Sequence, residues 1–460
     1  MQWLGDLEKI NRMQSARNSM KHLRFLTFGL CLALSSNNIA QVKQGSTLED
    51  FFNAALDFSP ELQIAAENLN ISKARRKAAN GQLLPQVNAG ASISDNRLNQ
   101  FNRIQKFDGE RLYLGLSQTL FNWQQFAARK QASFEEDQFE EEYYNQLALI
   151  LTEVAARYFD VLQSEDAIES IGSEIEALLN QRDQVQSLYD RQLVQVTDLY
   201  QVEATLAAAQ AAQLQLEAEF ALNRESLSSI SGLEVALLFR LADDIELPIL
   251  PFDQKYYVAQ ARKNNHRILA GEYAVKAAEQ RISERKGAYL PAVSLIAQRQ
   301  DADVGFDNLP IEQRDNTYIG LNVSIPIYAG GRNKAGVSEA ISRKSIAESE
   351  LRATQLEAQQ LVSSAYLRVQ ASAVQTNAAQ TLVESTILSS EAMRQGFELG
   401  TVTSVEVLNA LRDRFEAERE LQRIRYEHIR YLLLLKQETG TLTSEDVLEV
   451  GEWLVPREVE

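Results

Sequence analysis

The sequence contains very little of the chemistry that builds cofactor sites and covalent cross-links. It has one cysteine, Cys31, and three histidines, His22, His266 and His428, among 460 residues. A single thiol cannot form an internal disulfide, and it leaves a cysteine-based metal site without ligands. Four methionines are too few for a relay that passes a soft metal along the chain. We therefore expect no metal and no cofactor.

Basic residues are outnumbered by acidic ones, and long apolar runs are missing. Lysine and arginine number 46 against 63 aspartates and glutamates, which gives a formal net charge of −17. Nucleic-acid binding needs a basic footprint for the phosphates, so this balance argues against it. Mean hydropathy is −0.28, and no apolar run approaches the ~20 residues of a membrane helix. Membrane strands are not excluded, because their alternating side chains average to a neutral hydropathy.

Motifs that carry enzyme chemistry are missing as well. We find no glycine-rich phosphate loop, no metal-spaced histidines or cysteines and no nucleophile motif. Carboxylates are abundant, but they lie in charged helical runs that are typical of solvated helix faces. One such run comprises Glu135, Glu136, Asp137, Glu140, Glu141 and Glu142. The sequence therefore predicts a protein that is not an enzyme.

The N-terminus has the layout of a secretory signal peptide. A basic start at 21–24 precedes an apolar stretch at 25–34, and small and polar residues follow up to Ala40. The apolar stretch is too short for a membrane anchor, so we expect residues 1–40 to be removed on export. The residues before Met20 lack signal character, which makes Met20 a candidate for the true start. The alternative is an amphipathic helix of the mature fold.

The mature chain resembles itself at an offset near 207 residues. Residues 81–85 read GQLLP and residues 287–291 read GAYLP, while Tyr158 corresponds to Tyr366. So constant an offset indicates duplication of one structural unit, and its period is far too long for a solenoid. The expected divisions are a first repeat (41–240), a linker (241–255), a second repeat (256–440) and a tail (441–460).

Each repeat opens with the signals of a helix of about twenty residues. Ser59 is a capping residue before Pro60 at the first helical position. Asn265 and His266 stand at the same place in the second repeat, and we interpret His266 as a replacement for the proline. His428 falls in a row of apolar positions, and we interpret it as a packed side chain. Neither histidine is predicted to be a ligand.

Two strands with alternating apolar and small polar residues follow in each repeat. The expected strands are 86–94, 111–121, 292–298 and 318–327. This alternation suits strands with one face in lipid and the other in water, although it also suits a half-buried soluble sheet. Aromatic residues near the strand ends favour lipid, because such rings gather at the membrane interface. These residues are Phe121, Trp123, Tyr289 and Tyr328.

Long stretches without helix breakers come after each strand pair. No proline lies between Pro85 and Pro248, and apolar residues step by three and four along 147–189. That pattern predicts a coiled-coil seam. About sixty helical residues would reach ~90 Å. Turns are expected at 190–197 and 398–404, so each repeat should contain a long helical hairpin.

Four strands cannot close a membrane barrel alone. The smallest membrane barrels have about eight strands, and open strand edges are not tolerated in lipid. If the strands lie in a membrane, several copies of the chain must therefore share one barrel. The long hairpins would then continue the barrel as a helical tube, and a tube joined to a pore is a conduit.

The chain resembles the TolC-like outer-membrane efflux protein family over residues 48–440. The similarity lies in the two helix-to-strand openings, in SIPIYAGGR at 324–332 and in FELGTVTSVEVLNA at 397–410. The resemblance implies a mainly α fold with membrane β-strands, in which long coiled-coil helical hairpins form an α-barrel. It implies that four strands per chain contribute to a trimeric twelve-stranded β-barrel. It places the protein in the outer membrane, with most of its mass in the periplasm.

The same resemblance implies an exit duct of a tripartite efflux pump or a type I secretion system. The implied partners are two further copies of the chain, a periplasmic adaptor, an inner-membrane transporter of RND or ABC type, and outer-membrane lipid, but no nucleic acid. The alternative is a periplasmic adaptor or a structural coiled-coil protein of an envelope complex. Adaptors typically have one hairpin, so two hairpins favour the duct. The sequence does not name the substrate.

The resemblance makes the helix tips the candidate functional site. Family members narrow the tunnel there with acidic residues on the returning helices. The matching positions are Glu406 and Asn409 in the second repeat and Asp198 and Gln201 in the first. Three copies of Glu406 around one axis would favour cations. The alternative is that Asp198 and Glu406 only cap their helices.

The turns at the tips are the expected contact with the adaptor. The contact residues would be Leu193, Val194, Gly400 and Thr401. Family tips often use a tyrosine and an arginine to connect neighbouring coils, but Phe397 and Val402 stand at those positions. Gln192 occupies the place that Gly400 has in the second repeat, so we expect the two turns to differ in shape.

Overall fold

The computed structural model describes residues 46–100, 103–242, 245, 247–305 and 308–456. Residues 44–460 belong to one compact unit. The expected signal peptide at 1–40 lies outside the described residues. None of the helices described is both long enough and apolar enough to cross a membrane.

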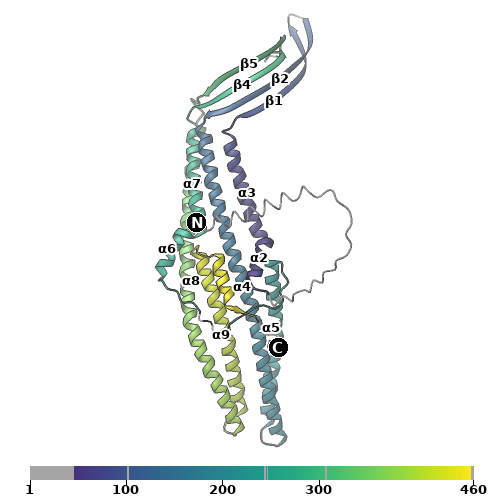
Figure 1. Cartoon of the computed structure of the whole chain (residues 1–460), viewed down its shortest axis with the longest axis vertical. Helices are drawn as coiled ribbons and strands as arrows, with labels where there is room; N and C mark the ends of the chain where they lie inside the picture. Colours follow the sequence, from purple (N-terminus) through teal and green to yellow (C-terminus); the bar gives the residue numbers. More distant parts are fainter. Residues whose placement is uncertain (1–45, 101–102, 243–244, 246, 306–307, 457–460) are drawn as a thin grey trace, which may run out of the picture. The chain divides into compact units, whose positions relative to one another are not determined.

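The same series of elements occurs twice in the described chain (Figure 1). The first series is α2 (Leu48–Phe58), α3 (Pro60–Gly81), β1 (Gln86–Gln100), β2 (Arg103–Phe121), α4 (Trp123–Asp190) and α5 (Val196–Ser231). The second series is α6 (Gln254–Asn264), α7 (His266–Gly287), β4 (Ala292–Val304), β5 (Pro310–Ser324), α8 (Arg332–Glu398) and α9 (Ser404–Glu438). Helices α4 and α8 have 68 and 67 residues, so the internal similarity of the sequence extends to its secondary structure.

Local sequence explains where the helices of each series begin. The Ser59 hydroxyl accepts a hydrogen bond from the Leu62 N–H, directly before Pro60 at the start of α3. The Asn265 side chain caps α7 in the same way. His266 is the first residue of α7, and its Nδ1 lies 2.7 Å from Glu141 Oε2 on α4. The predicted caps at Ser59 and Asn265 are confirmed.

The four long strands form one antiparallel sheet in the order β1-β2-β4-β5. All four extend further from the helices than the apolar alternation predicts, to Gln100, Arg103, Val304 and Pro310. Backbone pairing needs no apolar side chains, so it continues into polar sequence. At its other end β5 stops at Ser324, short of the predicted end at Ile327, because Pro326 has no N–H for a ladder.

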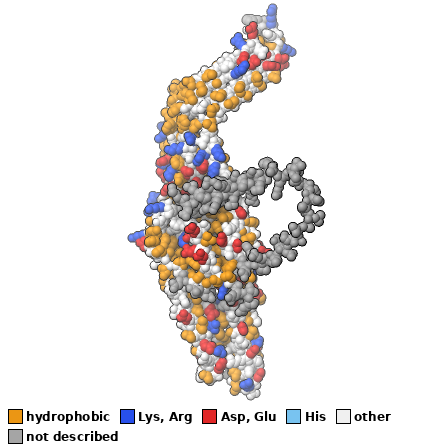
Figure 2. All heavy atoms as spheres, viewed as in Figure 1, with side chains coloured by type: hydrophobic (Ala, Val, Ile, Leu, Met, Phe, Trp, Pro, Cys, Tyr) orange, Lys and Arg blue, Asp and Glu red, His pale blue; other side chains and the backbone are white. Residues whose placement is uncertain are grey.

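One face of this sheet carries apolar side chains that nothing in the described chain covers. Val87 is 66% exposed and Ile319 74% exposed, with Leu114 and Leu321 similarly uncovered. The hydrophobic side chains of the sheet are visible in Figure 2. An apolar band on alternate residues is the pattern of strands that meet lipid. The outer edges of β1 and β5 have no partner strand within the described residues.

The largest hydrophobic cluster surrounds Tyr158 on α4. It contains residues of α2, α4 and α9 together with Val235 and Leu238 of the segment after α5. The Tyr158 hydroxyl donates to the Phe239 carbonyl and accepts from the Phe239 N–H, both at 3.1 Å. This pair of bonds fixes the segment after α5 against the long helices.

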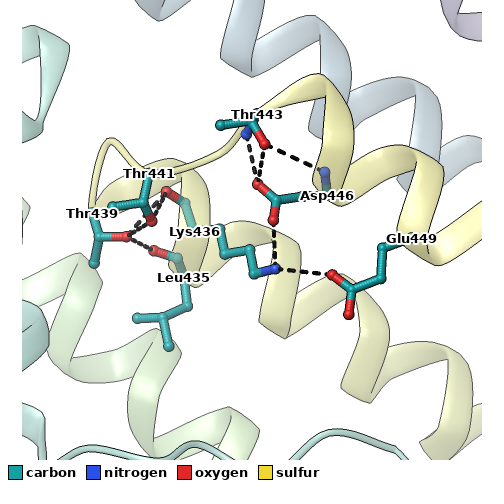
Figure 3. Close-up of polar contacts among 7 residues, drawn as sticks. All are labelled: Leu435, Lys436, Thr439, Thr441, Thr443, Asp446 and Glu449. Carbon is teal, nitrogen blue, oxygen red and sulfur yellow. Dashed lines mark hydrogen bonds and ion pairs between the residues drawn. The ribbon is translucent and has the colours of Figure 1, made fainter. Parts of the chain in front are cut away.

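The C-terminal tail is part of the same core. Helix α10 (Ser444–Glu452) buries Val447 and Val450 in the cluster, and β6 (Leu454–Val455) pairs with β3 (Arg240–Leu241). Lys436 Nζ on α9 lies 2.7 Å from Asp446 Oδ1 and 3.7 Å from Glu449 Oε2 (Figure 3). The tail is therefore attached to α9 by charge as well as by apolar contact.

Polar contacts join the first hairpin to the second. Arg419 Nη1 of α9 lies 2.7 Å from Glu174 Oε2 of α4, whose side chain is only 9% exposed. Tyr426 donates to Asp166 at 2.5 Å, and Arg430 pairs with Asp160. All three contacts connect α4 with α9, so the two hairpins are held together over several turns.

His428 is a packed residue, as the sequence predicts. Its side chain is fully buried; Nδ1 lies 2.9 Å from Ser372 Oγ on α8, and Nε2 lies 3.1 Å from the Pro248 carbonyl. Burial lowers the pKa of His428, with the Pro248 carbonyl acting in the opposite direction. The histidine therefore fastens the segment between the repeats to the second hairpin.

The acidic run on α4 is not the solvated face that the sequence predicts. Five of its six carboxylates are half-buried because α4 packs against both α3 and α7. Glu136 lies 3.2 Å from Arg76 of α3, and Glu141 contacts His266 of α7. Burial raises the pKa of Asp137 and of Glu140. A run of charged residues predicts a helix face that is exposed to solvent. The charge pattern does not show how many other helices pack around that face.

Candidate functional site at the helix tips

The two turns at the helix tips have the same backbone conformation. Gln192 and Gly400 both have a left-handed φ, of 63° and 73°. In each turn the next residue donates its N–H to the carbonyl five residues earlier, at 2.9 Å. The expectation that the turns differ in shape is therefore wrong. Each turn must close a hairpin between packed helices, so Gln192 adopts a conformation that costs a non-glycine residue roughly 1–2 kcal/mol.

Glu406 lies in the first turn of α9 and caps it. The Thr403 N–H and hydroxyl donate to Glu406 Oε2 at 2.7 and 2.8 Å, and the Glu406 N–H donates to Thr403 Oγ1 at 3.3 Å. The backbone and hydroxyl bonds from Thr403 lower the pKa of Glu406, which is fully exposed. Both hydrogen bonds to the carboxylate end on Oε2. Capping therefore leaves the other oxygen directed to solvent, and the charge stays on the side chain at neutral pH.

Asp198 has the corresponding position at the start of α5. The Gln195 N–H donates to Asp198 Oδ2 at 3.3 Å, and the Asp198 side chain is half-buried. Gln201 and Asn409 follow Asp198 and Glu406 by three residues, so each pair shares a helix face. Both Gln201 and Asn409 are exposed. Among the described residues, no hydrogen bond or ion pair joins Asp198 or Gln201 of α5 to Glu406 or Asn409 of α9.

One hydrophobic cluster brings the two tips together. It combines Leu199 and Val202 of α5 with Phe397 of α8 and Val407 and Leu408 of α9. The four predicted constriction residues therefore lie at the same end of the protomer, beside a shared apolar core. The sequence predicted these positions individually, and the tertiary structure places them at one end.

The residues predicted to contact an adaptor are accessible. Leu193 is 67% exposed, Gly400 and Thr401 are exposed, and Val194 is half-buried. Phe397 is buried in the tip cluster, and a Cβ added to Gly396 would lie 2.5 Å from Val402 Cγ2. Phe397 and Val402 thus pack against residues of the same chain.

Sequence reasoning missed the pair Glu174–Arg419. A signal was present, because Glu174 and Gln181 are polar residues inside the seam that Ile171, Leu178 and Val185 define. A carboxylate in such a seam requires a partner from a facing helix. The sequence does not show which helix faces it, so Arg419 could not be identified.

The helical hairpins, the uncovered apolar sheet face and the tips agree with one family. The model of the outer membrane efflux protein family matches residues 52–233 and 257–441. The chain belongs to this family. It is an outer-membrane exit duct for efflux or type I secretion, and its helices extend into the periplasm. The predicted family, fold class, function and location are confirmed.

Individual relatives cover nearly the whole chain. The chain is 25% identical to the outer membrane protein TolC of Vibrio cholerae over 431 residues, which are 92% of this chain and 98% of the relative. It is 23% identical to the alkaline protease secretion protein AprF of Pseudomonas aeruginosa, covering 87% and 85%. The solved outer membrane protein VceC of Vibrio cholerae has the same fold, with a TM-score of 0.73, 20% identity and coverage of 85% and 96%.

Proposed function

We propose that three copies of the chain form the duct. The observation that carries this proposal is the sheet of four strands, which has an uncovered apolar face and two outer edges without partner strands. Such edges must pair in lipid, and β5 of one copy can pair with β1 of the next. Three sheets give the twelve strands of a closed barrel, and the helices continue it as a tube.

The tips form the constriction of this tube. Glu406 and Asn409 of the second repeat, with Asp198 and Gln201 of the first, lie at the closed ends of the hairpins. Glu406 supports this role because it is exposed and charged, and because its pKa is lowered. Three copies around one axis focus a negative potential and favour cations.

The exposed turns serve as the docking site for a periplasmic adaptor, which links the duct to an inner-membrane transporter. Leu193 provides an exposed apolar side chain at the first turn, and Gly400 and Thr401 provide exposed backbone at the second. Relatives named for TolC and for protease secretion support a place in such an assembly. The transporter, rather than the duct, selects the substrate.

The substitution Glu406→Gln tests the constriction. Glutamine retains the capping geometry, which accepts Glu or Gln at this position, but it removes the charge. We expect the cation-to-anion permeability ratio in planar bilayers to fall by roughly a factor of two to ten. The matched control is Glu416→Gln, an exposed glutamate of the same helix ten residues further on, which should leave the ratio unchanged.

The mass of the protein extracted from outer membranes tests the assembly independently. A particle of three copies supports the shared barrel, and a monomer contradicts it. An unchanged reversal potential in Glu406→Gln would contradict the constriction even if three copies are found.

A further inference from the structure

Basic side chains gather where the long helices meet the strands (Figure 2). Each lies within seven residues of the helix end next to a strand, and all are exposed. Helices α3, α4, α7 and α8 all contribute. We call this group the basic belt, and it consists of Lys77, Arg129, Lys130, Lys286 and Lys334.

The side chains of the basic belt have no charged partner among the described residues. Within the part of the chain that the structure describes, none of the five forms an ion pair or a side-chain hydrogen bond. Lys344, further along α8, differs because it pairs with Glu279 at 2.8 Å and with Glu348 at 3.2 Å. In a chain with a net charge of −17, five exposed cations at one level without an ion-pair partner among the described residues are unusual.

Two hollows identify one side of the helix layer. The first is lined jointly by α4, α7 and α8, with Gln138, Ala277 and Arg343 among its residues. The second is lined by α3, α4 and α7 and includes Asn68. In each hollow the side chains of two outer helices meet over the middle helix, α7 in the first hollow and α4 in the second, and they can do so only on the side toward which the layer curves. The hollows therefore lie on the concave side.

Four of the five residues of the basic belt point to the opposite side. Arg129, Lys286 and Lys334 are each nine residues from the hollow-lining residue of the same helix, and Lys77 is nine residues from Asn68. Nine residues are about 2.5 helical turns, which reverses the direction of a side chain. In the tube of the proposed function, on which this inference rests, the concave side is the lumen. The belt is then on the outer wall.

Aromatic side chains define the depth of the belt. Trp123, Tyr289 and Tyr328 are exposed between the apolar strands and the helices, where amphipathic rings mark a membrane interface. The belt begins within the next turns of the helices, on the periplasmic side of these rings. Long basic side chains at such a level extend along apolar surface and place their charge among headgroups.

We propose that the basic belt binds the phosphate groups of anionic phospholipids in the inner leaflet of the outer membrane. Juxtamembrane lysines and arginines are attracted to anionic lipid surfaces, and the rest of this acidic chain would be repelled by them. With three copies, the belt forms a ring that fixes how deeply the duct sits in the membrane.

Native mass spectrometry of the assembled protein tests this proposal. The protein is released from micelles that contain equal amounts of phosphatidylglycerol and phosphatidylethanolamine. Wild type should retain phosphatidylglycerol preferentially, and the preference should decrease as ionic strength rises. In the triple variant Arg129→Gln, Lys286→Gln and Lys334→Gln, the ratio of retained phosphatidylglycerol to phosphatidylethanolamine should be about tenfold lower than in wild type.

The matched control removes three arginines near the same ends of α7 and α8 but on another side of these helices. It is the triple variant Arg281→Gln, Arg285→Gln and Arg343→Gln, whose residues line a groove between α7 and α8. This variant should keep the preference. Equal retention of both lipids by wild type, or equal loss in both variants, would overturn the proposal. The same spectra report the number of chains, so failure of the trimer is distinguished from failure of the belt.

Discussion

The two halves of the molecule have the same elements but bury them differently. Helix α4 places Tyr158, Phe159 and Leu162 fully inside the largest cluster. The equivalent helix α8 buries mainly alanine, valine and serine, and it leaves Leu356 and Val374 more than half exposed. The long helix of the first half therefore contributes large side chains to the core, while the long helix of the second half leaves apolar side chains exposed. Duplication preserved the backbone, and packing then gave the two copies different tasks.

The sharpest test of this comparison uses two equivalent tyrosines. Tyr158 is fully buried and hydrogen-bonded to Phe239, whereas Tyr366 is half-buried beside Tyr257. We expect Tyr158→Ala to lower the free energy of unfolding by about 3–5 kcal/mol, and Tyr366→Ala by less than half as much. Denaturant titration in detergent, followed by tryptophan fluorescence, measures both. Equal losses would show that the halves share the core equally.

The next largest effect concerns the contact between the halves. In Arg419→Ala the largely buried Glu174 loses its cross-hairpin partner, and we expect a loss of about 2 kcal/mol. The control is Arg394→Ala, since Arg394 pairs with Glu391 and Glu398 on its own helix and all three are about half exposed. That change should cost much less, because exposed ion pairs are screened by solvent and contribute little to stability. Similar costs for both variants would mean that the α4–α9 contact contributes little.

The turns allow a reciprocal exchange of residues. Gln192→Gly should raise the free energy of unfolding by about 1 kcal/mol, because glycine adopts a left-handed φ without strain. Gly400→Gln should lower it by a similar amount. Thermal unfolding of the two single variants and of the double variant measures the exchange, and the double variant should equal wild type. A destabilising Gln192→Gly would indicate that the glutamine side chain has a structural role.

The smallest effect distinguishes the halves by pH. His428 corresponds to Phe220 at the offset of 208, so only the second half titrates at this position. Burial lowers the pKa of His428, so the unfolded chain takes up its proton at a higher pH than the folded one. The stability that His428 contributes is therefore present above about pH 6.5 and is lost as pH falls through the folded pKa.

His428→Gln should remove this dependence. Asp137, Glu140 and Glu438, whose pKa values are raised by burial, act in the opposite direction. The quantity to measure is therefore the difference in melting temperature between wild type and His428→Gln from pH 7.5 to 5. A difference that does not change with pH would contradict the assigned effect.

Much of the fold and part of the candidate site could be predicted from the sequence. The helix caps at Ser59 and Asn265, the two hairpin turns and the packed His428 all follow from local patterns. The full strand lengths did not follow, because polar residues such as those beyond Ile93 pair through the backbone alone. The family resemblance identified Glu406, but the unengaged carboxylate oxygen beside its cap is a property of the folded turn.

The sequence by itself determined the periods, the breakers and the internal repeat, because each depends on residues close together along the chain or on a constant offset. Only the tertiary structure decided which of two residues at the same position of the repeats is buried in the core, as for Tyr158 and Tyr366. It also gave Gln192 a left-handed φ, enclosed the acidic run of α4 between α3 and α7, and paired Glu174 with Arg419. Each of these outcomes depends on which helices meet, and that is a contact between residues far apart in sequence.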